Sequence, residues 1–147
     1  MIYISHRGNL NGIDRSIENK PEQIELVLSK GFDCEIDVWN INGNWFLGHD
    51  GPEYSVGEDF LFTDGLWLHC KNKEALSSLI GSSAHYFWHQ EDDYTLTSHG
   101  YAWVYPGKDP IIRSICCLPE WNNTDISNFI GVCSDYVEDY RDKASTI

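Results

Sequence analysis

The stretch that decides the fold is "CEIDVWNINGNWFLGHD", residues 34–50, which starts as a β-branched and aromatic run, turns at Asn-Gly and returns to a His-Asp pair. Alternate residues of a β-strand point to the same face of the sheet, so Glu35 and Asp37 project side by side. Two carboxylates held this close repel each other unless a cation or a proton separates them. We therefore expect a positive charge beside Glu35 and Asp37.

The hairpin in this stretch can be checked by counting residues. A two-residue Asn-Gly turn pairs Ile41 with Asn44. The same register sets Asp37 opposite Gly48 and brings His49 to the height of the carboxylates. Strict alternation would turn His49 to the face opposite Asp37, so we expect the strand to end or bulge at Gly48, where glycine permits the distortion.

Short apolar runs rich in β-branched and aromatic residues recur along the chain. The run at residues 44–48 is the returning arm of the hairpin, and seven others are candidate strands of one sheet: residues 2–5, 32–39, 66–70, 85–88, 101–105, 114–118 and 129–133. Most of these runs are unbroken rather than alternating. Such runs are typical of strands that are buried on both faces, which favours a parallel sheet or barrel.

Two helices are predicted between these strands. One lies within residues 21–31, with Pro21 near its start and Gly31 as its stop, and a shorter one lies within residues 72–81. Beyond residue 90 the helical signal fades, so the later connections should be short. A full (β/α)8 barrel usually needs about 250 residues. The chain has 147 residues, which predicts an α/β fold built as a reduced TIM-like (β/α) barrel with short or missing later helices.

The composition of the chain excludes several classes of protein. The length and a hydrophobic share of 41% predict one domain over residues 1–147, and a net charge of −13 argues against nucleic acid or an anionic membrane surface as a partner. There is no basic and apolar leader and no apolar run of membrane-spanning length, so we expect a soluble, cytoplasmic protein. Five cysteines without CxxC spacing predict buried free thiols rather than a disulfide framework or a zinc site.

Polar residues gather where three of the predicted strands end. They are His6 and Arg7 after the first strand, Glu35 and Asp37 on the second, and His69 and Lys71 on the third. In a parallel barrel these ends share one mouth, where active sites are found. Any one of these residues alone would be an ordinary surface or capping charge. The combination of acids, imidazoles and cations predicts a functional site.

The spaced motifs resemble those of the glycerophosphodiester phosphodiesterase family. The similar segments are "HRG" at residues 6–8, "IENKPEQIELVLSKGFDCEIDVWNINGNWFLGHD" at residues 17–50 and "LWLHCKN" at residues 66–72. The family pattern runs HRG, EN, a helix, G-x-D-x-x-E-x-D, HD and a later acid-x-Lys, and the resemblance covers roughly the first half of the chain. "GVCSDYVE" at residues 131–138 is weakly similar to the last strand of the family, which carries a Thr-Asp pair.

The resemblance implies that His6 and His49 form an acid-base pair. It also implies that Glu35 and Asp37 bind a divalent metal, and that Arg7 and Lys71 bind phosphate. Elementary chemistry agrees with each role. An imidazole titrates near neutral pH and can accept or donate a proton. Hard carboxylate oxygens suit Mg²⁺ or Ca²⁺. A guanidinium grips two phosphate oxygens and an ammonium supplies a point charge. Glu18, in the EN motif, is expected to be a hydrogen-bonding support.

Two departures from the family pattern bear on the chemistry. His69 stands where the family places an acid two residues before the lysine, so the third metal ligand is either an imidazole or missing. An imidazole there favours Zn²⁺ or Mn²⁺ over Ca²⁺, and Glu120 is a candidate substitute carboxylate. The chain is also short, so the loops that would shape a pocket for the alcohol group are missing, and an open mouth suits a bulky or polymeric substrate.

The aromatic side chains near strand ends have two possible interpretations. Trp39, Trp88 and Trp103 could form a platform for a sugar or choline-like group. Packing in the core is the alternative, which we favour for at least two of them. His89, next to Trp88, is a candidate for the rim of the mouth or a hydrogen-bonded structural histidine.

The leading hypothesis is a metal-dependent phosphodiesterase that hydrolyses a glycerophosphodiester or a related diester in a lipid headgroup or glycan. A related hypothesis is a phospholyase of the sphingomyelinase D type, in which a neighbouring substrate hydroxyl attacks phosphorus and a cyclic phosphate forms. A third is a catalytically inactive module that binds a phosphate-bearing or sugar ligand. Seven strands would leave an open edge, which a covering loop or a second copy of the chain in a homodimer would protect.

Overall fold

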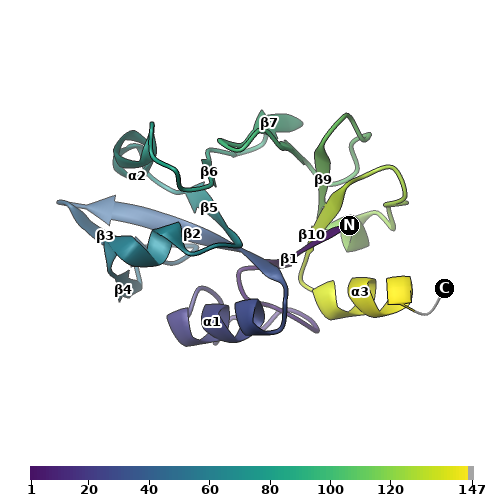
Figure 1. Cartoon of the computed structure of the whole chain (residues 1–147), viewed down its shortest axis with the longest axis horizontal. Helices are drawn as coiled ribbons and strands as arrows, with labels where there is room; N and C mark the ends of the chain where they lie inside the picture. The colour runs from purple at the N-terminus through teal and green to yellow at the C-terminus, as the bar shows by residue number, and fades with distance from the viewer. Residues whose placement is uncertain (146–147) are drawn as a thin grey trace.

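The computed structural model describes residues 1–145, which form one curled sheet with helices on its outer side (Figure 1). The strands are β1 (Ile2–His6), β2 (Asp33–Ile41), β3 (Asn44–Leu47), β4 (Tyr54–Val56), β5 (Leu66–Cys70), β6 (Tyr86–Phe87), β7 (Tyr94–Leu96), β8 (Ala102–Val104), β9 (Ser114–Cys117) and β10 (Gly131–Ser134). The α-helices within the described residues are α1 (Pro21–Ser29), α2 (Lys73–Leu79) and α3 (Val137–Ser145). Short 3-10 turns cover Glu58–Phe62 and Pro119–Trp121.

The centre of the sheet is parallel. Strands β6, β5, β2, β1, β10, β9 and β8 are neighbours in that order, and each pair runs in the same direction. These are the seven strands predicted from the apolar runs, so that prediction is confirmed. The hairpin arm β3 pairs antiparallel with β2 and carries β4 outward, and β7 pairs antiparallel with β8.

The sheet is a half-barrel and not a closed (β/α)8 barrel. Within residues 1–145, β6 and β7 do not pair as strands, although the amide of Ser98 donates to Tyr86 O over 2.9 Å and Thr95 Oγ1 donates to Trp88 O over 3.0 Å. Strands β6, β7 and β8 are only two to three residues long. Such short strands cannot supply the continuous ladder of hydrogen bonds that closure needs. The expectation of a barrel is therefore correct only as a curled, mixed α/β sheet.

Both predicted helices are present. Pro21 lies in the first turn of α1, where a backbone N–H would have no carbonyl acceptor within the helix, so proline is tolerated there. Gly31 follows the helix with φ of +86°. The Asn72 side chain caps α2 by accepting from the amide of Ala75 over 3.0 Å. Both helices pack against the sheet through buried apolar residues such as Val27 and Leu79.

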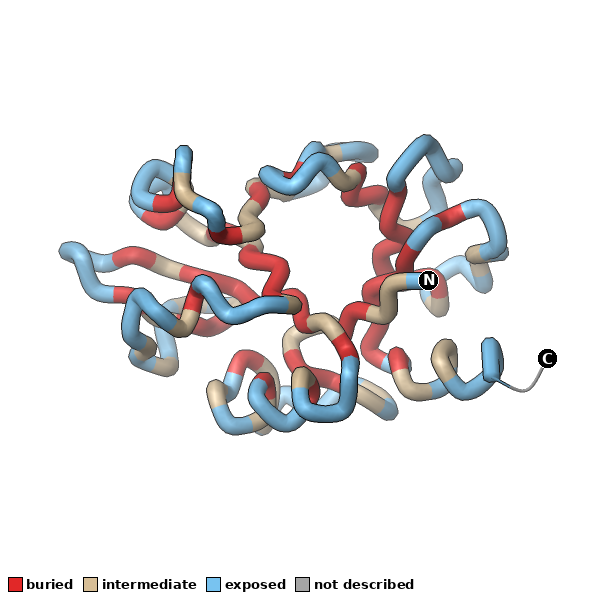
Figure 2. Tube along the Cα trace, viewed as in Figure 1, coloured by how far each residue is buried: buried red, intermediate tan, exposed pale blue. Residues whose placement is uncertain are grey.

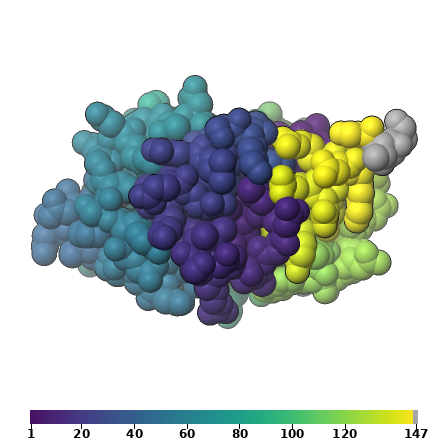
Figure 3. Space-filling model, turned by 90° about the horizontal axis from the view of Figure 1, so that it is seen from below, coloured from purple at the N-terminus to yellow at the C-terminus, as the bar shows by residue number. Residues whose placement is uncertain are grey.

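The third helix, α3, corrects the expectation that helical structure fades beyond residue 90. It follows β10 directly and is anchored by Val137, which is fully buried. The Arg141 guanidinium donates to Lys30 O over 2.7 Å, just after α1, so the two helices lie on the same side of the molecule (Figure 3). Tertiary contacts therefore stabilise a short charged helix that has a weak apolar pattern of its own.

The core lies on the two faces of the sheet, and buried residues follow the strands while loops are exposed (Figure 2). One cluster joins the sheet to α1 and α2, and a second gathers side chains from the other face, including Ile4, Trp67, Trp103 and Ile115. His6 follows Ile4 by two positions on β1, and His69 follows Trp67 by two positions on β5. Both histidines therefore point to this second face of the sheet. All five cysteines are buried and free, as predicted. No helix within residues 1–145 has the length and apolar character to cross a membrane.

Candidate active site and metal centre

The carboxyl ends of the parallel strands surround a cavity of about 320 Å³. Six of the seven predicted site residues line it: His6, Arg7, Glu35, His49, His69 and Lys71. The seventh, Asp37, is fully buried behind the cavity and lies next to Arg7, His49 and His69. The remaining walls come from later loops and strands and include His89, Gln90, Trp103, Tyr105, Pro106, Cys117, Leu118 and Trp121. Sequence segments that are far apart thus deliver the predicted residues to one place.

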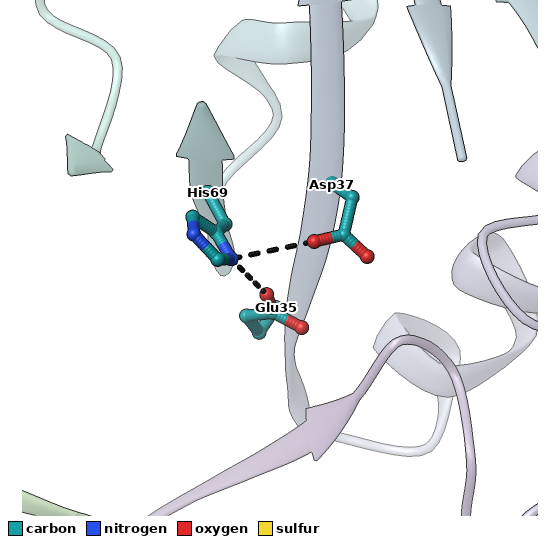
Figure 4. A group of neighbouring side chains, drawn as sticks. All are labelled: Glu35, Asp37 and His69. Carbon is teal, nitrogen blue, oxygen red and sulfur yellow. Dashed lines mark ion pairs between the residues drawn. The ribbon is translucent and has the colours of Figure 1, made fainter. Parts of the chain in front are cut away.

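Glu35, Asp37 and His69 form a compact group (Figure 4). Because β2 and β5 pair in parallel with Asp37 opposite His69, the two side chains leave neighbouring strands on the same face. The Nδ1 atom of His69 lies 3.4 Å from Oε2 of Glu35 and 3.3 Å from Oδ1 of Asp37. One ligand atom from each residue lies within 4.8 Å of the other two, so the group could hold a metal ion.

The hydrogen bonds around this group test whether a cation fits. Within residues 1–145, Oε1 of Glu35 and Oδ1 of Asp37 are buried and accept no hydrogen bond. The Nε2–H of His69 donates to His89 O over 2.7 Å, which leaves Nδ1 to face the carboxylates. A buried polar atom without a partner is costly, so these oxygens and the imidazole nitrogen suit a divalent cation. The residues present therefore fit a metal ion, which would neutralise the repulsion between the two adjacent carboxylates.

The pKa values of His69 and Asp37 also indicate that the carboxylates are stabilised by positive charge. Burial alone would lower the pKa of His69, but the nearby carboxylates of Asp37 and Glu35 raise it to about 10. Burial alone would raise the pKa of Asp37, but the nearby imidazoles of His49 and His69 and the charge of Arg7 hold it well below its usual range. When no metal is bound, a proton on His69 therefore balances part of the carboxylate charge.

His6 is held by an aspartate that the site prediction did not include. Its Nδ1–H donates to Oδ1 of Asp135 over 2.8 Å, and its Nε2 lies 4.0 Å from Oε1 of Glu35. Burial would lower the pKa of His6, but the hydrogen bond to Asp135 and the charge of Glu35 raise it to about 9. Asn9 donates a second hydrogen bond to Asp135 over 2.9 Å. The signal available in the sequence was a polar Ser-Asp pair at the end of a buried strand, in the weakly similar "GVCSDYVE" segment.

Arg7 adopts a left-handed backbone conformation, with φ of +62°. Its amide donates to Glu35 O over 2.9 Å, and its carbonyl accepts from the amide of Asn19 over 2.8 Å. These bonds hold a conformation that is unfavourable for a residue with a side chain, and such strain is common at functional sites. The guanidinium lies 3.5 Å from Asp37, 3.6 Å from Glu18 and 3.3 Å from His49 Nε2.

Glu18 and Asn19 of the EN motif support the site through hydrogen bonds. Glu18 accepts from Asn9 over 2.8 Å, which agrees with the supporting position expected for it. Asn19 was not singled out from the sequence, yet it makes a reciprocal pair with Asp37: Nδ2 donates to Oδ2, and the Asp37 amide donates to Oδ1, both over 2.9 Å. This pairing fixes Asp37 and leaves its Oδ1 directed at His69.

The hairpin prediction is confirmed. Ile41 pairs with Asn44, the amide of Gly48 donates to Asp37 O over 3.1 Å, and β3 ends at Leu47. A Cβ atom on Gly48 would lie 2.0 Å from Gly51 O, so the glycine is required where the strand ends. The turn brings Nδ1 of His49 to 3.6 Å from Oδ2 of Asp37.

Other predicted contributors differ in how they relate to the cavity. Glu120 is not part of the metal group, because its carboxylate accepts from Ser134 Oγ over 2.8 Å and from the Asp135 amide over 3.1 Å. Trp103 is buried in the second core cluster and also lines the cavity, whereas Trp39 donates to Gly48 O over 2.7 Å. The cavity walls formed by Gln90, Tyr105 and Trp121 were not predicted, since their segments carry no motif.

Chemically, this arrangement combines a cation-binding group, two imidazoles and two cationic side chains around one cavity in a strongly acidic chain. Such a set can bind an anion with tetrahedral oxygens and move protons on either side of it. No family model matches the sequence, and comparisons with curated proteins and with solved structures found no match either.

Proposed function

We propose that the chain is a reduced member of the glycerophosphodiester phosphodiesterase family, with a shortened TIM-like barrel, and that it hydrolyses a glycerophosphodiester or a related diester in the cytoplasm. The observation that carries the proposal is the joint position of His6, His49 and Arg7 around one cavity, beside the Glu35–Asp37–His69 group. Any one of these side chains has an ordinary structural explanation. Their convergence from separate strands is explained best by phosphodiester chemistry.

In this proposal, Arg7 and Lys71 bind the non-bridging oxygens of the phosphodiester. One histidine removes the proton from the attacking water, and the other protonates the leaving alkoxide as the P–O bond breaks. Asp135 orients His6 by accepting from Nδ1, so that Nε2 faces the cavity. His49 is oriented by Arg7, which donates to its Nε2, and by the nearby carboxylate of Asp37.

Glu35, Asp37 and His69 would hold the divalent metal, which when bound would neutralise negative charge on the phosphoryl oxygens. Two carboxylates favour Mg²⁺ or Ca²⁺, since both prefer oxygen ligands. An imidazole ligand increases the preference for Mn²⁺ or Zn²⁺. The mixed donor set therefore makes metal choice a direct test of whether His69 coordinates.

The experiment is turnover of glycerophosphodiesters followed by phosphorus NMR, with wild type, His6→Ala and His49→Ala, before and after chelation. General acid-base catalysis is typically worth about 10²–10⁴-fold, so each variant should lose about that much rate. His99→Ala is the matched control, because His99 lines a separate cavity that shares no residue with the site. Turnover that is indifferent to both histidine substitutions and to chelation would contradict the proposal.

The phosphorus spectrum also separates two reaction outcomes. Attack by water gives a phosphomonoester and a free alcohol. Attack by a neighbouring substrate hydroxyl gives a cyclic phosphate, which is the phospholyase reaction. The same sample therefore tests whether the chain hydrolyses the diester or cyclises it.

A binding module is the second candidate, and His69 favours it. Its imidazolium, 3.3 Å and 3.4 Å from the two carboxylates, could itself provide the positive charge that a metal would supply. The chain would then bind a phosphate-bearing ligand through Arg7 and Lys71 without turnover. Calorimetry with a glycerophosphodiester, with added Mg²⁺ or Mn²⁺ and again with chelator, decides between the two: binding in chelator with no product in either sample after long incubation would support the module, and turnover with metal would exclude it.

A further inference from the structure

A second cavity, of about 480 Å³, lies next to the candidate active site. It is lined by Ile13, Glu120, Trp121, Asp135, Tyr136, Asp139, Tyr140 and Lys143. Trp121 lines both cavities, and Asp135 is also the partner of His6. A molecule whose phosphate lay beside His6 would therefore extend over Trp121 into this second cavity.

Three aromatic residues, Trp121, Tyr136 and Tyr140, line the second cavity. Trp121 is 62% exposed and Tyr136 is 40% exposed, so their rings are open to a ligand. Tyr136 directly precedes α3 and Tyr140 lies in its first turn, and because they are four residues apart their rings lie on one side of the helix. Gly12 faces Tyr136, because a Cβ atom there would lie 3.5 Å from the tyrosine ring.

The charges around the second cavity limit the chemistry of its occupant. Glu120, Asp135 and Asp139 would repel an anionic group such as a further phosphate. The ammonium of Lys143 already lies 5.8 Å from the centre of the Tyr140 ring, where it would repel a ligand cation. An alkyl chain would remove water from these charged groups without replacing their hydrogen bonds, which is costly.

We propose that the second cavity is a subsite for an uncharged sugar or polyol ring, so that the alcohol esterified in the substrate is a glycosyl group. This inference rests on the proposed function for the scissile phosphate. The apolar C–H face of a sugar packs on the rings of Trp121 and Tyr136, and its hydroxyls hydrogen-bond to carboxylates such as that of Asp139. The open mouth left by the missing loops accommodates such a substituent.

Two diesters that share glycerol phosphate test the inference by activity. One carries glucose as the second alcohol and the other carries methanol. Tyr136→Ala should lower kcat/KM for the glucose diester about tenfold and leave the methyl diester unchanged, because the ring touches only the sugar. Tyr94→Ala is the matched control, since Tyr94 is also 40% exposed but lies on β7. Equal losses on both diesters, or none on either, would overturn the subsite.

Direct binding separates failure of the subsite from failure of the phosphodiesterase proposal. The indole N–H resonance of Trp121, assigned with Trp121→Phe, is followed while methyl glucoside or tetramethylammonium chloride is added to the intact protein. A shift with the glucoside that disappears in Tyr136→Ala and persists in Tyr94→Ala supports the subsite even if no diester is hydrolysed. A shift with tetramethylammonium alone, or with neither compound, overturns it.

Discussion

Nδ1 of His6 and Oδ1 of Asp135 lie 2.8 Å apart, although 129 residues separate them in the sequence. Parallel pairing of β1 with β10 makes this contact, because Ser5 pairs with Ser134 and the next residues, His6 and Asp135, lie side by side where the two strands end. The bond places the proton on Nδ1 and leaves Nε2 for the cavity. A carboxylate in this position also stabilises the imidazolium when Nε2 accepts a proton.

Asp135→Ala should therefore lower kcat for the methyl diester about 10–100-fold with little change in KM, because Asp135 positions His6 and the methyl group does not reach the second cavity. Asp135→Asn is the conservative variant, since an amide oxygen can still accept from His6 and from Asn9 but carries no charge. We expect it to retain more activity than the alanine variant. Circular dichroism checks that both variants fold, and an alanine variant as active as wild type would contradict the positioning role.

His69→Asp should change metal preference. It restores three carboxylates to the group with Glu35 and Asp37, so affinity for Mg²⁺ or Ca²⁺ should rise about tenfold while affinity for Zn²⁺ falls. Calorimetric titration of each metal alone measures this without any substrate. His99→Asp is the control, because His99 lines a separate cavity that shares no residue with the site. Identical metal affinities in wild type and His69→Asp would mean that His69 is not a ligand.

Local spacing explains why so much of the site was predictable. The register of the β2–β3 hairpin follows from its two-residue turn, and this register alone brings His49 to Asp37. Alternation along β2 likewise sets Glu35 and Asp37 on one face. Residues related by a turn or by strand period can be placed from the sequence because few backbone conformations satisfy the pattern.

Residues that reach the site through contacts between distant parts of the chain were harder to predict from the sequence. Asp135 and Trp121 reach the site only because β10 pairs with β1 and the turn after β9 packs against β10. Trp121 carries no local signal, and Asp135 carries only the weak signal of a Ser-Asp pair at the end of a buried strand. The helix α3 was missed for a similar reason, since one fully buried residue, Val137, and a hydrogen bond from Arg141 hold it in place. Closure of the barrel depended on strand lengths, which composition does not determine.

His85 should make stability fall in mild acid. Burial and, to a smaller extent, His99, whose ring is stacked with centroids 4.1 Å apart, lower its pKa to about 3. The folded pKa lies below the unfolded value, so the unfolded state binds more protons as pH falls below about 6.5, and stability decreases from there toward the folded pKa. His6 and His69 act in the opposite sense, because their raised folded pKa values make them contribute more stability as pH falls toward the unfolded value, so the effect of His85 is read from a comparison with a His85 variant.

The test is urea unfolding of wild type and His85→Gln at about pH 7.5 and about pH 5.5, where most carboxylates stay ionised. Glutamine retains a group that can hydrogen-bond to Thr97, which His85 contacts over 2.7 Å, but it does not titrate. As pH falls between these two values, the free energy of unfolding of wild type should fall relative to that of the variant by up to about 1 kcal/mol after allowance for partial exposure. The same change in both proteins would show that His85 makes no such contribution.

Gly48→Ala should disturb both stability and the site. An added Cβ would lie 2.0 Å from Gly51 O, a backbone atom that cannot move away without shifting the loop that carries His49. We expect a loss of about 1–3 kcal/mol in the free energy of unfolding, together with weaker turnover as His49 leaves Asp37. Urea unfolding and the phosphodiester assay measure the two effects.

Gly51→Ala is the matched control in the same loop, because a Cβ atom at Gly51 meets nothing within 4 Å. Its free energy of unfolding should stay within about 0.5 kcal/mol of wild type. The comparison separates the need for a glycine at the strand end from general sensitivity of the loop. If Gly48→Ala were as stable and active as Gly51→Ala, the tight turn that brings His49 to the carboxylates would not be required for the fold or for the site.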